Sequence, residues 1–344
     1  MKNILKKFLV LSLSAGLLLT ACSKKDEKKS DENSEKLKVV TTIFPEYDLT
    51  RAIAKDKVDL DMLIKPGVDV HSFSPTPSDI KTVEKSDIFI YGGTDHDKWV
   101  ETITKSVNLN SKKVVKLTDG IQQLEEETVD GMKHEHHHEE SSADEKHEHK
   151  HDDESCEECG HSHGNGSEVE LDPHFWTSPK NAISMVKSIA NSLMEKDPKN
   201  SAFYKENAEN YIKQLEEVDK ELNSVADSSK LKKVVIADRF PFRYLFDDLS
   251  IEYRALFSGC SVESTASAGQ IKKMVDYVKE NNIKVIYHIE MGKGDMAQTV
   301  AKDTGAKVLM LHSIHTVTKS EFENGVTYVD LMKKNVDALR EGLN

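Results

Sequence analysis

Two runs of alternating strand-like and helix-like segments constrain the fold of this chain more than any other feature. The first run has predicted strands at 37–42, 58–64, 87–91 and 113–117, with helices at 47–54, 77–84 and 97–106. The second has predicted strands at 233–237, 285–289 and 308–311, with helices at 242–249, 265–281, 296–304 and 328–343. This alternation is typical of α/β lobes built on parallel sheets. We therefore expect an α/β fold with two lobes.

Two further predicted helices, 179–196 and 201–227, separate the runs. The second carries Tyr204, Ala208 and Tyr211, followed by Leu215 and Val218, at steps of three and four residues, as one buried helix face requires. At about 1.5 Å per residue it is roughly 40 Å long, enough to connect two lobes.

The composition along the chain predicts five parts. They are a signal peptide at 1–22, a flexible tether at 23–36, a first lobe at 37–177 with a mobile loop at 131–167, a helical connection at 178–228, and a second lobe at 229–344.

The N-terminus resembles a bacterial lipoprotein signal. Lysines in the first seven residues precede an apolar run, Phe8–Leu19, that is too short to cross a bilayer. Leu-Thr-Ala-Cys follows, ending at Cys22, and resembles a lipobox whose cysteine is lipidated. We expect an extracytoplasmic protein, anchored to the cell membrane through acylated Cys22.

Histidine is the main compositional anomaly, because nine of the 15 histidines lie between His134 and His163. The surrounding segment lacks apolar periodicity, so we expect a mobile loop that gathers metal near the binding site. Its candidate ligands are His134, His136, His137, His138, His147, His149, His151, Cys156, Cys159, His161 and His163. The Cys156 and Cys159 pair can be a metal clip or a disulfide. For Cys260 we expect apolar packing or a place near the cleft rather than a metal role.

The formal net charge of −13 argues against nucleic acid as a partner. Outside the histidine-rich segment, His71, His174, His312 and His315 lie just beyond predicted strands or in proline-flanked turns. Loops after the carboxyl ends of parallel strands line the ligand crevice, so these side chains are placed to converge. Asp172, two residues before His174, is expected to accept a hydrogen bond from the imidazole of His174 and so to orient the ring.

Long ordered motifs then identify a resemblance that covers Leu37–Asn344. They are VTTIFPEYDLTRAIAKDKVDLDMLIKPGVDVHSFSPTPSDI, LDPHFWTSP with the helix pair that follows it, and the closing TYVDLMKKNVDALREGL. The chain resembles the cluster A-I metal-binding lipoproteins, the solute-binding components of zinc and manganese ABC importers. The resemblance implies two Rossmann-like lobes joined by a long rigid helix, with one divalent cation in the cleft. It also implies delivery of that cation to an ABC-transporter permease with its ATPase.

The resemblance implies His71 and His174 as first-lobe ligands. After the first strand of the second lobe, where the family usually has His or Glu, this chain has VVIADRFPFRY, and Asp238 is the nearest replacement. His312 is the expected substitute for the usual final carboxylate, and His315 is a second candidate.

Glu290 stands where the family has an acidic residue near the cleft, and it can instead be a second-shell or salt-bridge partner. Neutral imidazoles with one carboxylate favour Zn²⁺ over Mn²⁺. We expect a monomer that is not an enzyme. A zinc hydrolase and a surface adhesin or metal buffer are the alternatives.

Overall fold

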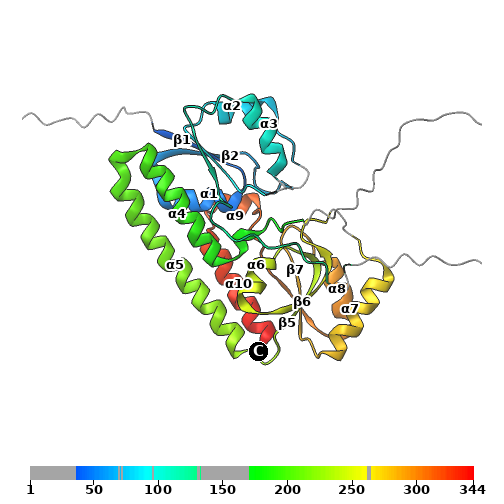
Figure 1. The fold of residues 1–344 in the computed structure, drawn as a ribbon. Coiled ribbons are helices and arrows are strands. Elements are labelled where there is room, and N and C mark those ends of the chain that lie inside the picture. The colour runs from blue at the N-terminus through cyan, green and yellow to red at the C-terminus, as the bar shows by residue number, and fades with distance from the viewer. Residues whose placement is uncertain are drawn as a thin grey trace, which may run out of the picture. The chain divides into compact units, whose positions relative to one another are not determined.

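Two parallel four-stranded sheets organise the chain (Figure 1). The computed structural model describes residues 36–68, 70, 73–94, 97–129, 132, 170–261 and 265–344. Lys36–Asn344 form one compact unit that contains both sheets. The prediction of an α/β fold with two lobes is confirmed.

The first sheet has the strand order β2-β1-β3-β4. Its strands are β1 (Leu37–Thr41), β2 (Val58–Met62), β3 (Ile88–Tyr91) and β4 (Lys113–Lys116). The helices between them are α1 (Phe44–Ala54), α2 (Pro77–Glu84) and α3 (Lys98–Ser106). All pairings are parallel, so the four strands end at the same edge of the sheet.

The second sheet repeats this topology in the order β6-β5-β7-β8. Its strands are β5 (Lys233–Phe240), β6 (Glu252–Ser258), β7 (Val285–His288) and β8 (Lys307–Met310). The associated helices are α6 (Arg243–Leu249), α7 (Ala268–Glu280), α8 (Asp295–Thr304), α9 (Lys319–Glu323) and α10 (Tyr328–Leu343).

Successive strand residues face different cores, as the pleat requires. Val39 of β1 belongs to the largest apolar cluster, whereas its neighbour Val40 packs in a smaller cluster with α2 and α3. In the second sheet, Val234 lies in the largest cluster and Val235 in the cluster formed with α7 and α8. Each sheet is therefore covered on both faces.

The lobes share the largest cluster through three long helices. These are α4 (Pro179–Lys196), α5 (Ser201–Ser228) and α10, and α5 packs against both of the others (Figure 1). Ser178 begins α4, because its Oγ accepts from Asn181 N at 3.2 Å and Pro179 occupies the first turn. A continuous core beside both sheets favours a fixed arrangement of the lobes.

The sequence missed β6 and α9. In β6, exposed Glu252 and half-buried Arg254 interrupt the apolar run, because this strand lies at the sheet edge and, among the described strands, pairs with β5 alone. The helix α9 has only five residues and no buried side chain, so it shows no apolar periodicity.

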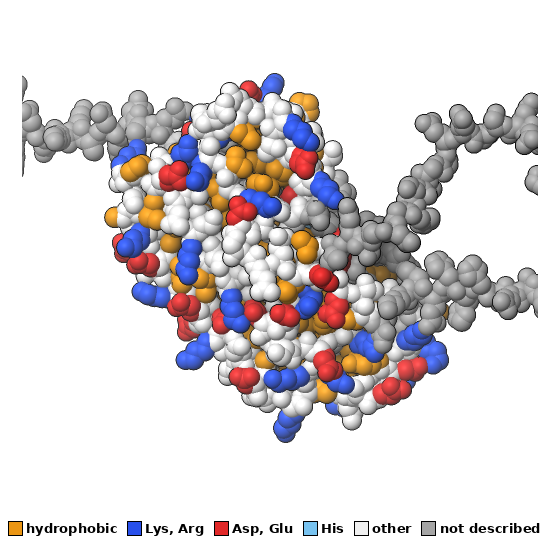
Figure 2. Space-filling view, viewed as in Figure 1, with side chains coloured by type: hydrophobic (Ala, Val, Ile, Leu, Met, Phe, Trp, Pro, Cys, Tyr) orange, Lys and Arg blue, Asp and Glu red, His pale blue; other side chains and the backbone are white. Residues whose placement is uncertain are grey.

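The surface carries interspersed acidic and basic side chains over the face drawn in Figure 2, as is usual for a solvated surface. Within the part of the chain that the structure describes, no helix is both long and apolar enough to cross a membrane.

Candidate metal-binding site

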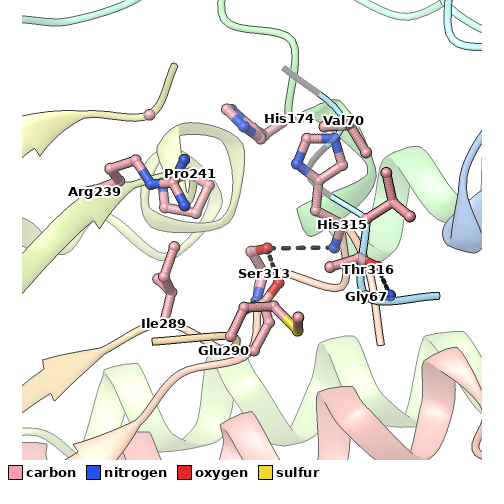
Figure 3. A pocket seen from close by; sticks show the side chains of 13 residues that line it. Gly67, Val70, His174, Arg239, Pro241, Ile289, Glu290, Ser313, His315 and Thr316 are labelled. Carbon is pink, nitrogen blue, oxygen red and sulfur yellow. Dashed lines mark hydrogen bonds between the residues drawn. The ribbon is translucent and has the colours of Figure 1, made fainter. Parts of the chain in front are cut away.

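A pocket lies between the two lobes, at the carboxyl ends of the second-lobe strands (Figure 3). The first lobe contributes the loop after β2 and the turn that contains His174. The second lobe contributes the ends of β5, β6 and β7 and the loop after β8. The lining residues are Gly67, Val68, Val70, His174, Arg239, Pro241, Gly259, Ile289, Glu290, Met291, Ser313, His315 and Thr316.

His174 lines this pocket, and the carboxylate of Asp172 fixes the orientation of its imidazole. The residue is 1% exposed and precedes a short 3₁₀ helix, Phe175–Thr177. Asp172 Oδ1 accepts from His174 N at 2.8 Å and contacts His174 Nδ1 at 3.1 Å. Because a carboxylate only accepts, Nδ1 carries the proton and the lone pair is on Nε2. Nε2 is the atom that a metal ion would bind.

His315 lies beside His174 in the same pocket. The two ring centroids are 5.5 Å apart with the planes at 90°. The ring of Trp176 is 4.8 Å from that of His315, and Trp176 Nε1 donates to Ser313 O at 3.0 Å. This bond ties the turn of His174 to the loop of His315, so the two imidazoles are positioned together.

The loop from His312 to His315 has a constrained backbone. Ile314 has a φ of 64°, which is unusual for a β-branched residue. His312 Nδ1 accepts from Ile314 N at 2.9 Å, and Asn335 bonds both the N and O atoms of His312 at 2.7 and 2.8 Å. Glu290 accepts from Ser313 N at 2.8 Å and from its hydroxyl. These contacts stabilise a turn that places His315 in the pocket.

His312 itself is 2% exposed and is absent from the pocket lining. Since its Nδ1 accepts a backbone N–H, the neutral ring carries its proton on Nε2, which has no lone pair to offer a metal. That Nε2 is buried without a hydrogen-bond partner among the described residues. The geometry therefore favours His315 over His312 as the ligand from this loop. Glu290 also lines the pocket, and both of its oxygens accept hydrogen bonds from Ser313.

Asp238, the expected second-lobe ligand, is absent from the pocket lining, which contains its neighbour Arg239. A bulge in β5 between Ile236 and Arg239 adds one residue and changes which side chains face the cleft. Asp238 is half-buried, and its carboxylate accepts from Arg239 N at 2.8 Å and Ile289 N at 3.3 Å. Burial raises the pKa of Asp238 above its usual range. Arg239, which the sequence analysis did not single out, lines the pocket in its place.

Several predicted residues lie outside the described part of the chain: Cys22, His71 and the histidine-rich segment with Cys156 and Cys159. Within the described ranges, no three His, Cys, Asp or Glu side chains form a group that could hold a metal ion. Cys260 is half-buried next to Gly259, and burial raises the pKa of its thiol far above the usual range. A protonated thiol matches the packing role expected for it.

Comparisons with known proteins agree with this architecture. Residues 39–342 match the ZnuA family, described as zinc-uptake complex component A, periplasmic. The high-affinity zinc uptake system protein ZnuA of Bacillus subtilis is 34% identical over 95% of this chain and 94% of its own length. The zinc-binding protein AdcA of Streptococcus pyogenes is 35% identical over 89% of this chain, but the match spans only 56% of AdcA.

Solved structures show the same fold. The metal-dependent lipoprotein YcdH of Bacillus subtilis superposes with a TM-score of 0.70 at 30% identity, covering 90% of this chain and 99% of the other. The Zn(II)-bound ZnuA-like domain of Streptococcus pneumoniae AdcA has a TM-score of 0.69 at 26% identity, covering 90% and 99%.

Proposed function

Because this chain belongs to the ZnuA family of zinc-uptake components, we propose that it captures one zinc ion outside the cytoplasm and delivers it to an ABC-transporter permease for import. The observation that carries the proposal is the pairing of His174 and His315 in one interlobe pocket. Asp172 fixes the tautomer of His174, and the loop after β8 presents His315. Neutral imidazoles of this kind suit zinc.

The proposed ligands are His174 and His315 together with His71. His71 comes from the resemblance in sequence, and its neighbours Val70 and Gly67 line the same pocket. Asp238 and His312 stay predictions as ligands, while the hydrogen bonds of both favour a supporting role. We retain the domain boundaries expected from the sequence as part of this proposal.

Transport, rather than hydrolysis, is the role of the family to which the chain belongs. Formal H-E-x-x-H matches occur at 134–138 and 147–151, and a G-x-S-x-G match occurs at 160–164. These matches lie in the histidine-rich segment, whose composition predicts no helix or strand–turn–helix to display them. A turnover assay with saturating zinc tests the hydrolase alternative, and we expect no activity.

The direct test of zinc capture measures zinc affinity by competition with a chelator of known affinity. We compare the mature protein with His174→Ala, and use His288→Gln, which changes a histidine outside the pocket lining, as the control. Loss of one ligand should weaken binding by orders of magnitude, whereas the control should bind normally. Deleting the gene should reduce cellular zinc uptake. Unchanged uptake would favour an adhesin or metal buffer.

We propose that acylated Cys22 anchors the protein to the membrane and that the segment 131–167 gathers zinc for the cleft. Cys22→Ala should release the protein from the membrane fraction. Excision of 131–166 should remove weak zinc sites, which lose metal as histidines protonate near pH 6, and should keep the tight site. A titration of both proteins at about pH 7.5 and about pH 5.5 distinguishes these sites. Loss of the tight site on excision would contradict the proposed ligand set.

A further inference from the structure

A tyrosine hydroxyl from the second lobe is inserted into a short antiparallel ladder beside the proposed zinc site. The ladder is centred on the bridge between Glu125 and Leu171. Next to this bridge, Asp172 N donates to Leu124 O at 2.9 Å, and in a regular ladder Leu124 N would donate to Asp172 O in return. Instead, Leu124 N donates to Tyr244 Oη at 3.1 Å, and that hydroxyl donates to Asp172 O at 2.9 Å. The hydroxyl of Tyr244 therefore takes the place of one ladder hydrogen bond.

The surroundings of Tyr244 suit this role. The residue belongs to α6 and is 4% exposed, and α6 packs against the short helix Phe175–Thr177 that follows His174. Burial raises the pKa of Tyr244 to about 12, so the hydroxyl keeps its proton at neutral pH. A neutral hydroxyl both donates and accepts, which matches the two backbone groups that it joins. The ring is held by the core of the second lobe, so its hydroxyl has a defined position.

The position of Asp172 matters because its carboxylate orients His174. Asp172 Oδ1 accepts from His174 N at 2.8 Å and contacts Nδ1 of the imidazole at 3.1 Å. A direct bond from Leu124 N to Asp172 O would require a separation of about 2.9 Å. The intervening hydroxyl keeps these two atoms further apart, so its loss would let the strands approach and would shift the Asp172 backbone. The reach of the carboxylate to the imidazole thus depends on the spacing of the ladder.

We propose that Tyr244 is a positioning residue for zinc binding, whose hydroxyl spaces the ladder so that Asp172 orients the ligand His174. The inference rests on the proposed zinc-capture function and adds a second-lobe residue to the support of a first-lobe ligand. Because Tyr244 lies in the second lobe, the imidazole of His174 is oriented for zinc only while α6 stays against the ladder.

The test removes the hydroxyl and keeps the ring. In Tyr244→Phe, Leu124 N and Asp172 O can pair directly, so the ladder keeps its hydrogen bonds while Asp172 shifts. We expect zinc affinity, measured on the mature protein by chelator competition, to fall by about tenfold, at the lower end of the range for residues that orient a metal-binding histidine. Urea unfolding of the apo protein measures stability in parallel.

Two variants that lose the same group at other places are matched controls. Tyr204→Phe removes a buried hydroxyl that donates to Asp197 at 2.7 Å, so it should lower stability without changing zinc affinity. Tyr253→Phe removes a hydroxyl that donates to Glu127 at 3.0 Å, close to the ladder but away from Asp172, and should bind zinc as wild type does. A loss of affinity that simply followed stability would appear in Tyr204→Phe as well.

A second measurement reports on the orientation of the ligand directly. In apo protein with ¹⁵N-labelled histidine, the ring nitrogen shifts of His174 show which nitrogen carries the proton. The wild type should have the proton on Nδ1, where Asp172 accepts it. Tyr244→Phe should increase the share with the proton on Nε2, whereas Tyr204→Phe and Tyr253→Phe should not. A residue that only stabilised the fold would leave this ratio unchanged.

A double variant then tests whether Tyr244 acts through Asp172. Asp172→Ala removes the carboxylate and keeps the backbone carbonyl that Tyr244 contacts. In this background Tyr244→Phe should cause no further loss of zinc affinity, because no carboxylate is left to position. An equal loss in both backgrounds would overturn the inference, as would wild-type affinity and an unchanged His174 tautomer in Tyr244→Phe. Failure of the wild type to bind zinc would refute the proposed function, and the tautomer of apo His174 would still decide the role of Tyr244.

Discussion

The imidazole of His174 lies directly against Gly259, such that a Cβ at Gly259 would be 2.8 Å from His174 Cε1. The same Cβ would be 2.8 Å from Phe240 O, a backbone atom that cannot rotate away. A first-lobe histidine thus packs against the residue that follows β6 in the second lobe. This contact requires glycine for reasons of space.

Gly259→Ala should therefore displace His174 and weaken zinc binding, with a destabilisation of about 1–3 kcal/mol from overpacking. Chelator competition and urea unfolding measure the two effects. Gly269→Ala is a matched control, because its Cβ would meet only Ser267 Oγ at 3.9 Å. If Gly259→Ala bound zinc as tightly as wild type, His174 would not be held at the ion by this contact.

Asp172→Asn should lower zinc affinity by about 10- to 100-fold, because a neutral amide is a weaker acceptor for His174 Nδ1–H and holds the ligand tautomer less firmly. Both side chains are buried, at 2% and 1% exposure, so water would not replace the lost interaction. Titration calorimetry of apo protein with zinc measures the change. The exposed Asp247 offers the control Asp247→Asn. Equal affinities for wild type and Asp172→Asn would exclude this orienting role.

His315→Ala and His312→Ala should have opposite dominant effects. Loss of His315 should reduce zinc affinity by orders of magnitude with little change in apo-protein stability. Loss of His312 leaves the buried Ile314 N–H without its acceptor and should lower the free energy of unfolding by about 1–3 kcal/mol, with the smaller effect on zinc. Thermal unfolding of the apo proteins and zinc competition test both variants. The reverse pattern would support His312 as the ligand.

Glu46 should make stability depend on pH. Burial, with a further contribution from Asp97, raises the pKa of Glu46 to about 8, although hydrogen bonds from Thr42 and Ile43 oppose this shift. The folded protein then retains a proton that the unfolded chain releases above its ordinary pKa of 4.5. Stability attributable to Glu46 is therefore complete below that value and is lost as pH rises towards 8.

Glu46→Gln should remove this loss, so the variant should gain stability relative to wild type between mildly acidic and mildly alkaline pH. Urea unfolding of the apo protein across this range measures it, with Glu84→Gln at an exposed position on α2 as control. Parallel pH profiles for wild type and Glu46→Gln would show that Glu46 is ionised in the folded state.

The alternation of segments predicted seven of the eight described strands, all except β6, and a crevice at the carboxyl ends of strands, where the pocket lies. Arg239, Gly259, Glu290 and Ser313 all follow or end strands of the second sheet and line one pocket. His174, which we expected near the cleft, lines the pocket, and Asp172 two residues earlier contacts its Nδ1. The order of strands and helices along the chain is therefore enough to place these residues near the carboxyl ends of the strands.

The choice between neighbouring side chains was not available from the sequence. The bulge in β5 changes which of Asp238 and Arg239 lines the cleft, and it depends on pairing with a distant strand, β6. Likewise, His315 rather than His312 lines the pocket at a turn in which Ile314 has a left-handed backbone, and this turn is held by Asn335 and Glu290 from other elements. Such tertiary constraints leave no local pattern.

The most direct test of zinc binding between the lobes is a crystal structure of the mature, zinc-loaded protein measured at the zinc absorption edge. We expect one strong anomalous peak in the interlobe pocket, about 2.0–2.1 Å from Nε2 of both His174 and His315. A peak bound through His312, or anomalous signal that avoids the pocket altogether, would contradict the account.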